Sequence, residues 1–179
     1  MLPKEWIAQL FGIAAMVLNI LSYQGKKQRT VIAMQFFGGA LFAANFLMLG
    51  ATVGGILNIL AVFRALLFLN KEKVKADSPI WLAVFISCFV AVYVLNFTLW
   101  GKEVTAFNLI LEILPVIGMT ALSVGFRMKN AAAIRKLGLI SSPAWLIYNI
   151  SVGSWGATIC EILTLGSIFI GMFRHDKKD

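Results

Sequence analysis

The sequence predicts an all-α membrane protein with seven transmembrane helices, built as two parallel triple-helix bundles joined by a linker helix. Three observations lead to this prediction. Hydrophobic residues make up 60% and charged residues 13% of the 179 positions, a balance typical of chains that lie mostly inside a bilayer. The apolar runs have membrane length, and basic residues gather in alternate loops between them. A repeat at an offset of 103 residues relates the first three runs to the last three.

A helix that crosses a bilayer needs about 17–25 mostly apolar residues. The sixth run of this chain is short and contains Pro143, so we expect its helix to begin earlier, near Ala131. Lys4 and Glu5 lead straight into the first run without a small-residue cleavage site, so we expect no cleavable signal. The predicted spans are 6–24, 31–49, 53–69, 80–99, 104–126, 137–152 and 155–173.

The Lys and Arg residues are distributed unequally between the two sides of these spans. Thirteen fall on one side and two, Lys4 and Lys102, on the other, while Arg64 lies within a span, where its long side chain can reach the membrane surface. Because cytoplasmic loops carry the excess of positive charge, the N-terminus is predicted outside and the C-terminus in the cytoplasm. The net charge of +8 therefore indicates orientation in a membrane, and no nucleic-acid partner is expected. The thirteen are Lys26, Lys27, Arg29, Lys71, Lys73, Lys75, Arg127, Lys129, Arg135, Lys136, Arg174, Lys177 and Lys178.

The repeat sets the predicted domain organisation. Residues 1–75 form a first triple-helix bundle, 76–102 a linker transmembrane helix, and 103–179 a second bundle with a cytoplasmic tail. Since a single linker span restores the orientation, the two bundles are expected to be related by an axis along the membrane normal. The pairs that coincide at the offset include Met16 with Met119, Lys26 with Lys129, Gly50 with Gly153, Ile56 with Ile159 and Leu60 with Leu163.

Glu161 is the strongest single indication of a working site. It is the seventh residue of an otherwise uncharged apolar helix, and a charge at the centre of a membrane helix costs about 2.5–3.5 kcal/mol on insertion scales. At the 103-residue offset Asn58 corresponds to Glu161, so the two are expected to face each other across a central solute site near the midplane. In the structural alternative, Asn58 hydrogen-bonds a neighbouring helix, and Glu161 pairs with Arg64 or with a backbone group.

Further polar and aromatic residues are predicted to line the same site. Asn108 and Glu112 lie one turn apart on a face of the fifth span, with Pro115 just beyond. An interhelical hydrogen-bond cluster is the alternative for this pair. Pro115 and Pro143 each free a backbone carbonyl, so both are candidate hinges.

The outer end of the sixth span carries Trp145, Tyr148 and Asn149. We assign these three residues to the solute site, with Trp145 and Tyr148 as an aromatic wall that stacks on a ring-shaped solute. The alternative is an interfacial aromatic belt, which we favour for Trp155.

The spans contain no residues in the pattern of an enzyme active site. No Ser–His pair, paired Asp or metal-ligand spacing occurs in them, so neither catalysis, a bound metal nor a cofactor is expected. Cys88 and Cys160 both lie within apolar spans, where a disulfide is not expected.

Several stretches resemble the YgjV family of small bacterial inner-membrane proteins, and this resemblance covers nearly the whole chain. It implies a multi-pass protein of the bacterial inner (plasma) membrane. Family members can carry His at the positions of Asn45 and Tyr148, so a histidine-based proton relay is not expected here. The stretches are Glu112-Ile-Leu-Pro115-Val-Ile-Gly118, Trp145-x-Ile-x-Asn149-x-x-x-Gly153-Ser154-x-Gly156-x-Thr158-x-x-Glu161 and Ile56-Leu57-Asn58.

The predicted layout also resembles the SWEET sugar transporters and the PnuC vitamin transporters. In SWEETs an Asn on the third helix of each triplet contacts the solute, which corresponds here to Asn58 and, by substitution, to Glu161. The SWEET hinge prolines are retained only as Pro115 and Pro143. This resemblance is one of fold, and it carries a function only by analogy.

The sequence as a whole predicts a membrane transporter for a small polar solute of the vitamin, nucleoside or sugar class, working by alternating access. Nothing resembles an ATP-binding motif, so transport is expected to be facilitated or ion-coupled. The alternative is a non-transporting inner-membrane scaffold or assembly partner whose intramembrane polar residues are structural. The expected partners are the lipid bilayer and the solute, and a homo-oligomer is left open.

Overall fold

The computed structural model describes residues 3–22, 28–76, 78–125, 127–128 and 131–175. Every regular element among them is a helix. The loop residues Lys26, Lys27 and Lys129 and the tail residues Lys177 and Lys178, on which part of the charge count rests, lie outside this description. The helices are α1 (Lys4–Ser22), α2 (Gln28–Met48), α3 (Thr52–Leu69), α4 (Lys71–Val74), α5 (Pro79–Thr98), α6 (Ala106–Gly125), α7 (Ala131–Ser151) and α8 (Trp155–His175).

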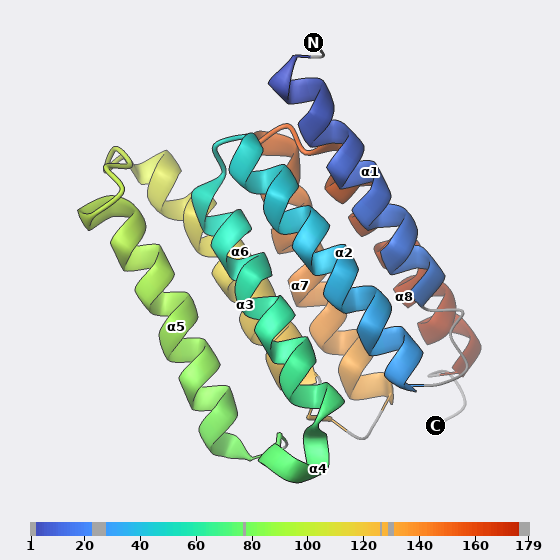
Figure 1. The fold of residues 1–179 in the computed structure, drawn as a ribbon. Coiled ribbons are helices and arrows are strands. Elements are labelled where there is room, and N and C mark those ends of the chain that lie inside the picture. The colour runs from blue at the N-terminus through green and yellow to red at the C-terminus, as the bar shows by residue number, and fades with distance from the viewer. Residues whose placement is uncertain (1–2, 23–27, 77, 126, 129–130, 176–179) are drawn as a thin grey trace.

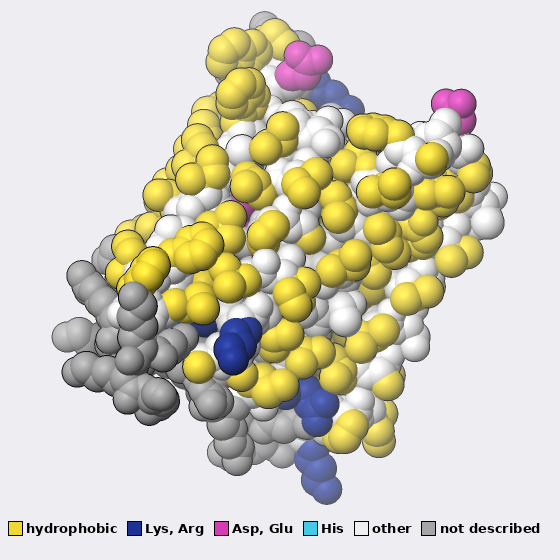
Figure 2. All heavy atoms as spheres, turned by 180° about the vertical axis from the view of Figure 1, so that it is seen from behind, with side chains coloured by type: hydrophobic (Ala, Val, Ile, Leu, Met, Phe, Trp, Pro, Cys, Tyr) yellow, Lys and Arg dark blue, Asp and Glu magenta, His cyan; other side chains and the backbone are white. Residues whose placement is uncertain are grey.

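The composition of the helices is that of a membrane protein. Five of them in the described part of the chain, α1, α3, α5, α6 and α8, are long and apolar enough to cross a bilayer. The apolar part of α2, Ala33–Met48, is shorter, and α7 carries Arg135 and Lys136 in its second turn. Figure 2 shows hydrophobic side chains over much of the visible surface, with basic side chains toward one end and both acidic and basic side chains at the other. Such a surface suits lipid rather than water.

The long helices lie side by side in one bundle (Figure 1). Helix α2 packs between α1 and α3, α7 packs between α6 and α8, and α1 also contacts α8. Helix α5 contacts α3 and α6 at the edge of the bundle. We call the end of the bundle where α1 begins the N face; it also holds the turns at 49–51 and 152–154 and the loop at 99–105. We call the opposite end, which holds α4, the C face.

The helix bounds repeat at the offset found in the sequence. Helices α2 and α7 begin and end 103 residues apart, and α3 and α8 begin 103 residues apart. Gly50 and Gly153 both have positive φ, 76° and 71°, which glycine adopts without strain. The next backbone N–H in each turn bonds a carbonyl five residues back, Ala51 to Phe46 and Ser154 to Asn149, both at 2.9 Å. The superposition of the two halves as parallel bundles stays a prediction, as does the external N-terminus.

The two intrahelical prolines leave their helices continuous. Pro115 lies inside α6 and Pro143 inside α7. The start of α7 at Ala131 agrees with the expectation that the sixth helix begins before its apolar run. Each proline removes one backbone hydrogen bond, so a hinge at either place stays a prediction.

Candidate functional site

A cavity of about 450 Å³ lies within the bundle and is lined by residues of α1, α2, α3, α6, α7 and α8. No described residue of α5 lines it. Its volume is in the range of cavities that hold small organic molecules, about 300–1,000 Å³.

Asn58 and Glu161, the pair predicted from the repeat, both line this cavity. Each is the seventh residue of its helix, counted from Thr52 and Trp155, which places both Cα atoms about 9 Å below the helix start. The Asn58 side-chain amide donates to the Gly54 carbonyl of its own helix at 2.9 Å, and not to a neighbouring helix. The Glu161 carboxylate has the Ser142 side chain of α7 within hydrogen-bonding reach.

Arg64 lies in the cavity wall, which differs from the expectation that it reaches the membrane surface. Its side chain is buried, and its Nη1 donates to the Ser123 hydroxyl of α6 at 2.7 Å. Ser123 in turn donates to the Met119 carbonyl at 2.8 Å. The small Ser123 provides an acceptor within the bundle, so Arg64 has a partner there and need not extend to the surface. The cavity therefore has an acidic residue on α8 and a basic residue on α3.

Trp145 forms part of an aromatic wall of the cavity, and its contact with a solute stays a prediction. It lines the cavity together with Phe42 and Phe46 of α2, and the rings of Phe46 and Trp145 lie 5.9 Å apart. Gly118 provides the space for the indole ring, because a Cβ at this position would lie 2.5 Å from Trp145 Cδ1. Neither phenylalanine was predicted from the sequence, although their i, i+4 spacing on α2 was a possible signal.

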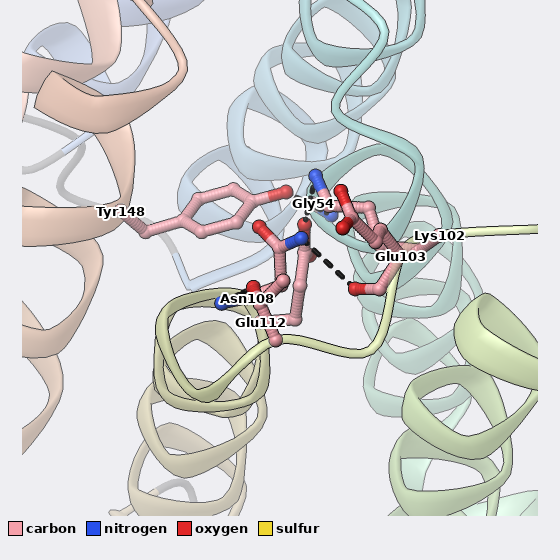
Figure 3. Close-up of polar contacts among 7 residues, drawn as sticks. Gly54, Lys102, Glu103, Asn108, Glu112 and Tyr148 are labelled. Atoms are coloured by element: carbon pink, nitrogen blue, oxygen red, sulfur yellow. Dashed lines mark hydrogen bonds and ion pairs between the residues drawn. The ribbon is translucent and has the colours of Figure 1, made fainter.

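Tyr148 is not in this wall. Its side chain is fully buried one turn nearer the N face, where it packs against Phe46 and Trp145 with ring centroids 6.0 and 5.9 Å apart. Its hydroxyl accepts a 3.0 Å hydrogen bond from the backbone N–H of Gly54 in the first turn of α3. Figure 3 shows the hydroxyl directed toward Gly54 and Glu112. A Cβ at Gly54 would lie 2.7 Å from the tyrosine ring, so this contact depends on glycine.

Glu112 lies beside Tyr148 in the N-face half of the bundle (Figure 3). Its side chain is 4% exposed, and its Oε1 lies 3.1 Å from the Nζ of Lys102. Its Oε2 is buried and has no hydrogen-bond partner in the described part of the chain. Glu112 is thus held in the barrier between the cavity and the N face rather than in the cavity wall.

Asn108 and Asn149 also lie away from the cavity lining. Asn108 donates through its side chain to the Glu103 carbonyl at 2.9 Å, and its backbone N–H bonds the Thr105 hydroxyl at 3.1 Å, so it fixes the loop before α6. Asn149 is buried, its backbone carbonyl accepts from Ser154 at 2.9 Å, and its side-chain oxygen has no partner among the described residues. Of the seven predicted binding residues, the structure brings Asn58, Trp145 and Glu161 together around the cavity and places the other four toward the N face.

A second polar cluster closes the N face between α1, α2 and α8. Gln9 donates to the Gly153 carbonyl at 2.7 Å and accepts from the Trp155 N–H at 3.1 Å. Asn45 accepts from the Ser154 hydroxyl at 2.6 Å and donates to the Ala8 carbonyl of α1 at 2.7 Å. At the 103-residue offset, Gln9 corresponds to Glu112 and Asn45 to Tyr148.

The cavity extends toward the C face and stops short of the N face. On the C-face side its lining includes Phe68 and Gly125, at the ends of α3 and α6, and Met128, whose side chain is 42% exposed. On the N-face side, the two polar clusters and the close crossing of α1 over α8, where Gly156 meets the Gly12 backbone, lie between this cavity and a separate hollow lined by Gln9 and Gly153. The structure is therefore closed at one end.

Comparison with known proteins confirms the resemblance seen in the sequence. Residues 6–179 match the Imp-YgjV family, described as a bacterial inner membrane protein. The chain is 26% identical over 177 residues to the inner membrane protein YgjV of Escherichia coli (strain K12), an alignment that covers 97% of this chain and 88% of that protein. No solved structure matches the chain, and the likeness to SWEET and PnuC transporters stays a prediction.

Proposed function

We propose that this chain, which belongs to the Imp-YgjV family of bacterial inner membrane proteins, is a transporter that moves a small polar solute across that membrane. One observation carries the proposal: the cavity that contains Asn58, Trp145 and Glu161 extends to the C face and is sealed from the N face. A site open to one side at a time is the basic requirement of alternating access.

The polar side chains around the cavity favour transport over a purely structural role. A scaffold would be expected to bury its intramembrane polar groups against one another, because each unpaired group in hydrocarbon costs several kcal/mol. Here Glu161, Arg64 and Asn58 each contact one group of the protein, Ser142, Ser123 and Gly54, and their carboxylate, guanidinium and amide also line the same 450 Å³ space. These polar side chains would bind the polar groups of a solute that occupies the cavity.

The chemistry of the lining favours a cationic or hydrogen-bonding solute that contains a ring. Glu161 can pair with a positive charge or accept from a donor, and Asn58 lies at the same depth on the first half of the chain. Trp145, Phe42 and Phe46 supply aromatic surface, and aromatic rings attract both other rings and cations. A vitamin or a nucleoside fits this lining better than a neutral sugar.

With the predicted orientation, the N face is external and the structure is the inward-facing state. Opening to the outside would require the two N-face clusters to separate and the C-face end to close. Pro115 lies in α6 between the N-face end of the helix and the cavity-lining residues, and Pro143 lies in α7 at the level of the cavity. A change of bend at either place would have this effect. In the absence of an ATP-binding motif, transport would be facilitated or ion-coupled.

The native Cys160 provides a test that needs no known solute, because it lines the cavity. In a Cys88→Ala background, Cys160 is reacted with a membrane-impermeant thiol reagent, applied to intact spheroplasts or to inverted vesicles. A transporter exposes Cys160 to both sides in turn, so we expect labelling from both. Labelling from one side only, or from neither, would favour the scaffold.

A second experiment addresses the solute. Proteoliposome uptake is compared for radiolabelled thiamine, adenosine and glucose, as representatives of a cationic vitamin, a nucleoside and a neutral sugar. We expect thiamine and adenosine to enter faster than glucose, and Glu161→Gln to reduce their entry, because the carboxylate is lost while the side-chain shape is kept. Glu103→Gln, the same change at an exposed acid, is the control. Equal entry by Glu161→Gln and by the parent protein would refute the role of Glu161.

A further inference from the structure

We propose that Glu112 is a proton-binding latch: uptake of a proton from the N-face side releases Lys102 and opens the sealed end of the cavity. This inference rests on the proposed transport function and concerns how the same cavity is opened. It begins from two observations. The buried Glu112 carboxylate faces the Tyr148 hydroxyl, and its Oε2 makes no hydrogen bond among the described residues. Its Oε1 forms an ion pair with a loop residue, Lys102.

The N face is sealed by two clusters that correspond at the 103-residue offset but differ in charge. In one cluster, Gln9 and Asn45 bond the turn and the start of α8 through neutral amides. In the other, Tyr148 bonds the start of α3, and Glu112 stands where the first cluster has Gln9. Only the second of these two clusters holds a carboxylate, so its strength depends on a charge and the strength of the first does not.

The groups around Glu112 favour a proton over a metal ion as the bound species. The Lys102 ammonium lies 3.1 Å from Oε1 and would repel a cation, and no group of three metal-ligating side chains occurs among the described residues. Tyr148 faces Glu112 from α7, and α3 presents the Gly54 backbone. From α5, the Tyr93 hydroxyl is engaged with the Leu109 carbonyl at 3.2 Å. A proton on Oε2 creates an O–H donor, for which the facing Tyr148 hydroxyl oxygen is an acceptor.

Protonation would weaken the seal by a defined sequence of changes. The proton passes from external water to Oε2 and converts the carboxylate to a neutral acid. The ion pair with Lys102 is then lost, and the ammonium, already 37% exposed, moves into water at the N face. Without protonation, the departure of Lys102 would leave a buried, uncompensated carboxylate, which is strongly unfavourable. Opening of the N face and proton binding therefore favour each other.

The test measures how readily Cys160 reacts from the N-face side in full-length protein carrying Cys88→Ala. Glu112→Gln mimics the protonated acid and should increase this reaction about 5–150-fold, the usual range of coupling between two sites. Glu103→Gln removes an exposed charge from the same loop and should leave the reaction unchanged. Gln9→Ala loosens the neutral cluster and should increase the reaction equally at every pH.

The pH dependence separates a proton latch from a general loosening of the seal. At each pH, the reaction rate of Cys160 is divided by the reaction rate of an exposed N-face thiol, which is introduced as Lys4→Cys in a cysteine-free protein. This ratio removes the pH dependence that comes from ionisation of a thiol. We expect this ratio to rise on external acidification with Glu112 present and to be constant with Glu112→Gln. Glu112→Asp, which keeps the charge, should restore the dependence.

Three results would overturn the proposal: an unchanged reaction rate in Glu112→Gln, a pH dependence that persists in that variant, or a ratio that is independent of pH when Glu112 is present. Reaction of Cys160 from the C-face side verifies that each variant is folded. If Glu112→Gln is unstable, Lys102→Met is used instead, and it is expected to open the N face in the same way. If Cys160 reacts from both sides without any effect of pH, the latch is refuted while the transport proposal stands.

Discussion

Gly156 lies in the first turn of α8, where α8 crosses α1 so closely that its position has no space for a side chain. A Cβ there would overlap the Gly12 carbonyl and lie 2.6 Å from the backbone nitrogen of Ile13. Carbon contacts are normally about 3.5–4.0 Å. Because the obstacles are backbone atoms, Gly156→Ala must separate α1 and α8 by about 1 Å. The seal of the N face should loosen at the same time.

The expected loss of stability can be worked out from two opposing terms. Inserting a methyl group into a packed interface costs about 1–3 kcal/mol, whereas replacing Gly by Ala in a helix gains up to about 1 kcal/mol. Gly156→Ala should therefore lower the unfolding free energy by about 1.5 kcal/mol, within a range of about 0–3 kcal/mol. Gly166, on the same helix, has no atom within 4 Å of the place that a Cβ would occupy, so Gly166→Ala should be neutral or stabilising.

Thermal unfolding of the two purified variants in the same detergent tests this difference. For a chain of this length, 1 kcal/mol corresponds to a change in Tm of roughly 2–4 °C. We expect Gly156→Ala to melt several degrees below Gly166→Ala. If Gly156→Ala melts at or above both the parent protein and Gly166→Ala, then α1 and α8 do not cross at this glycine, and the closure of the N face must be explained differently.

Three other predictions concern orientation, the cavity wall and the central carboxylate. A reporter fused after Lys178 should read cytoplasmic and one inserted beside Lys102 external, and the reverse result at either position would contradict the topology. Gly118→Ala should displace the Trp145 indole and lower Tm by several degrees, because its Cβ would lie 2.5 Å from the ring; an unchanged Tm would contradict this packing. Glu161→Gln should leave Tm within about 2 °C of the parent, since glutamine can keep the contact with the Ser142 side chain, whereas a large fall would show that the carboxylate is structural.

The sequence by itself determined the helices and the depth of their polar residues. Apolar run length located the seven long helices to within a few residues, apart from the earlier start of α7, which Arg135 and Lys136 indicated. The 103-residue offset predicted that Asn58 and Glu161 belong to one site, and both line the cavity. These features follow from the chain alone, because helix length and distance along a helix depend only on local geometry.

Only the tertiary structure decided which face of each helix points inward. Tyr148 and Glu112 were assigned to the solute site but lie in the seal, and Arg64 was expected at the surface but lines the cavity. The reason is physical: lipid tails are as apolar as the protein interior, so hydrophobic pattern does not distinguish inward from outward faces in a membrane. The rotation of each helix is set instead by close packing at small residues, such as Gly54 against Tyr148 and Gly118 against Trp145. Such pairs form between distant parts of the chain, and a single sequence does not reveal them.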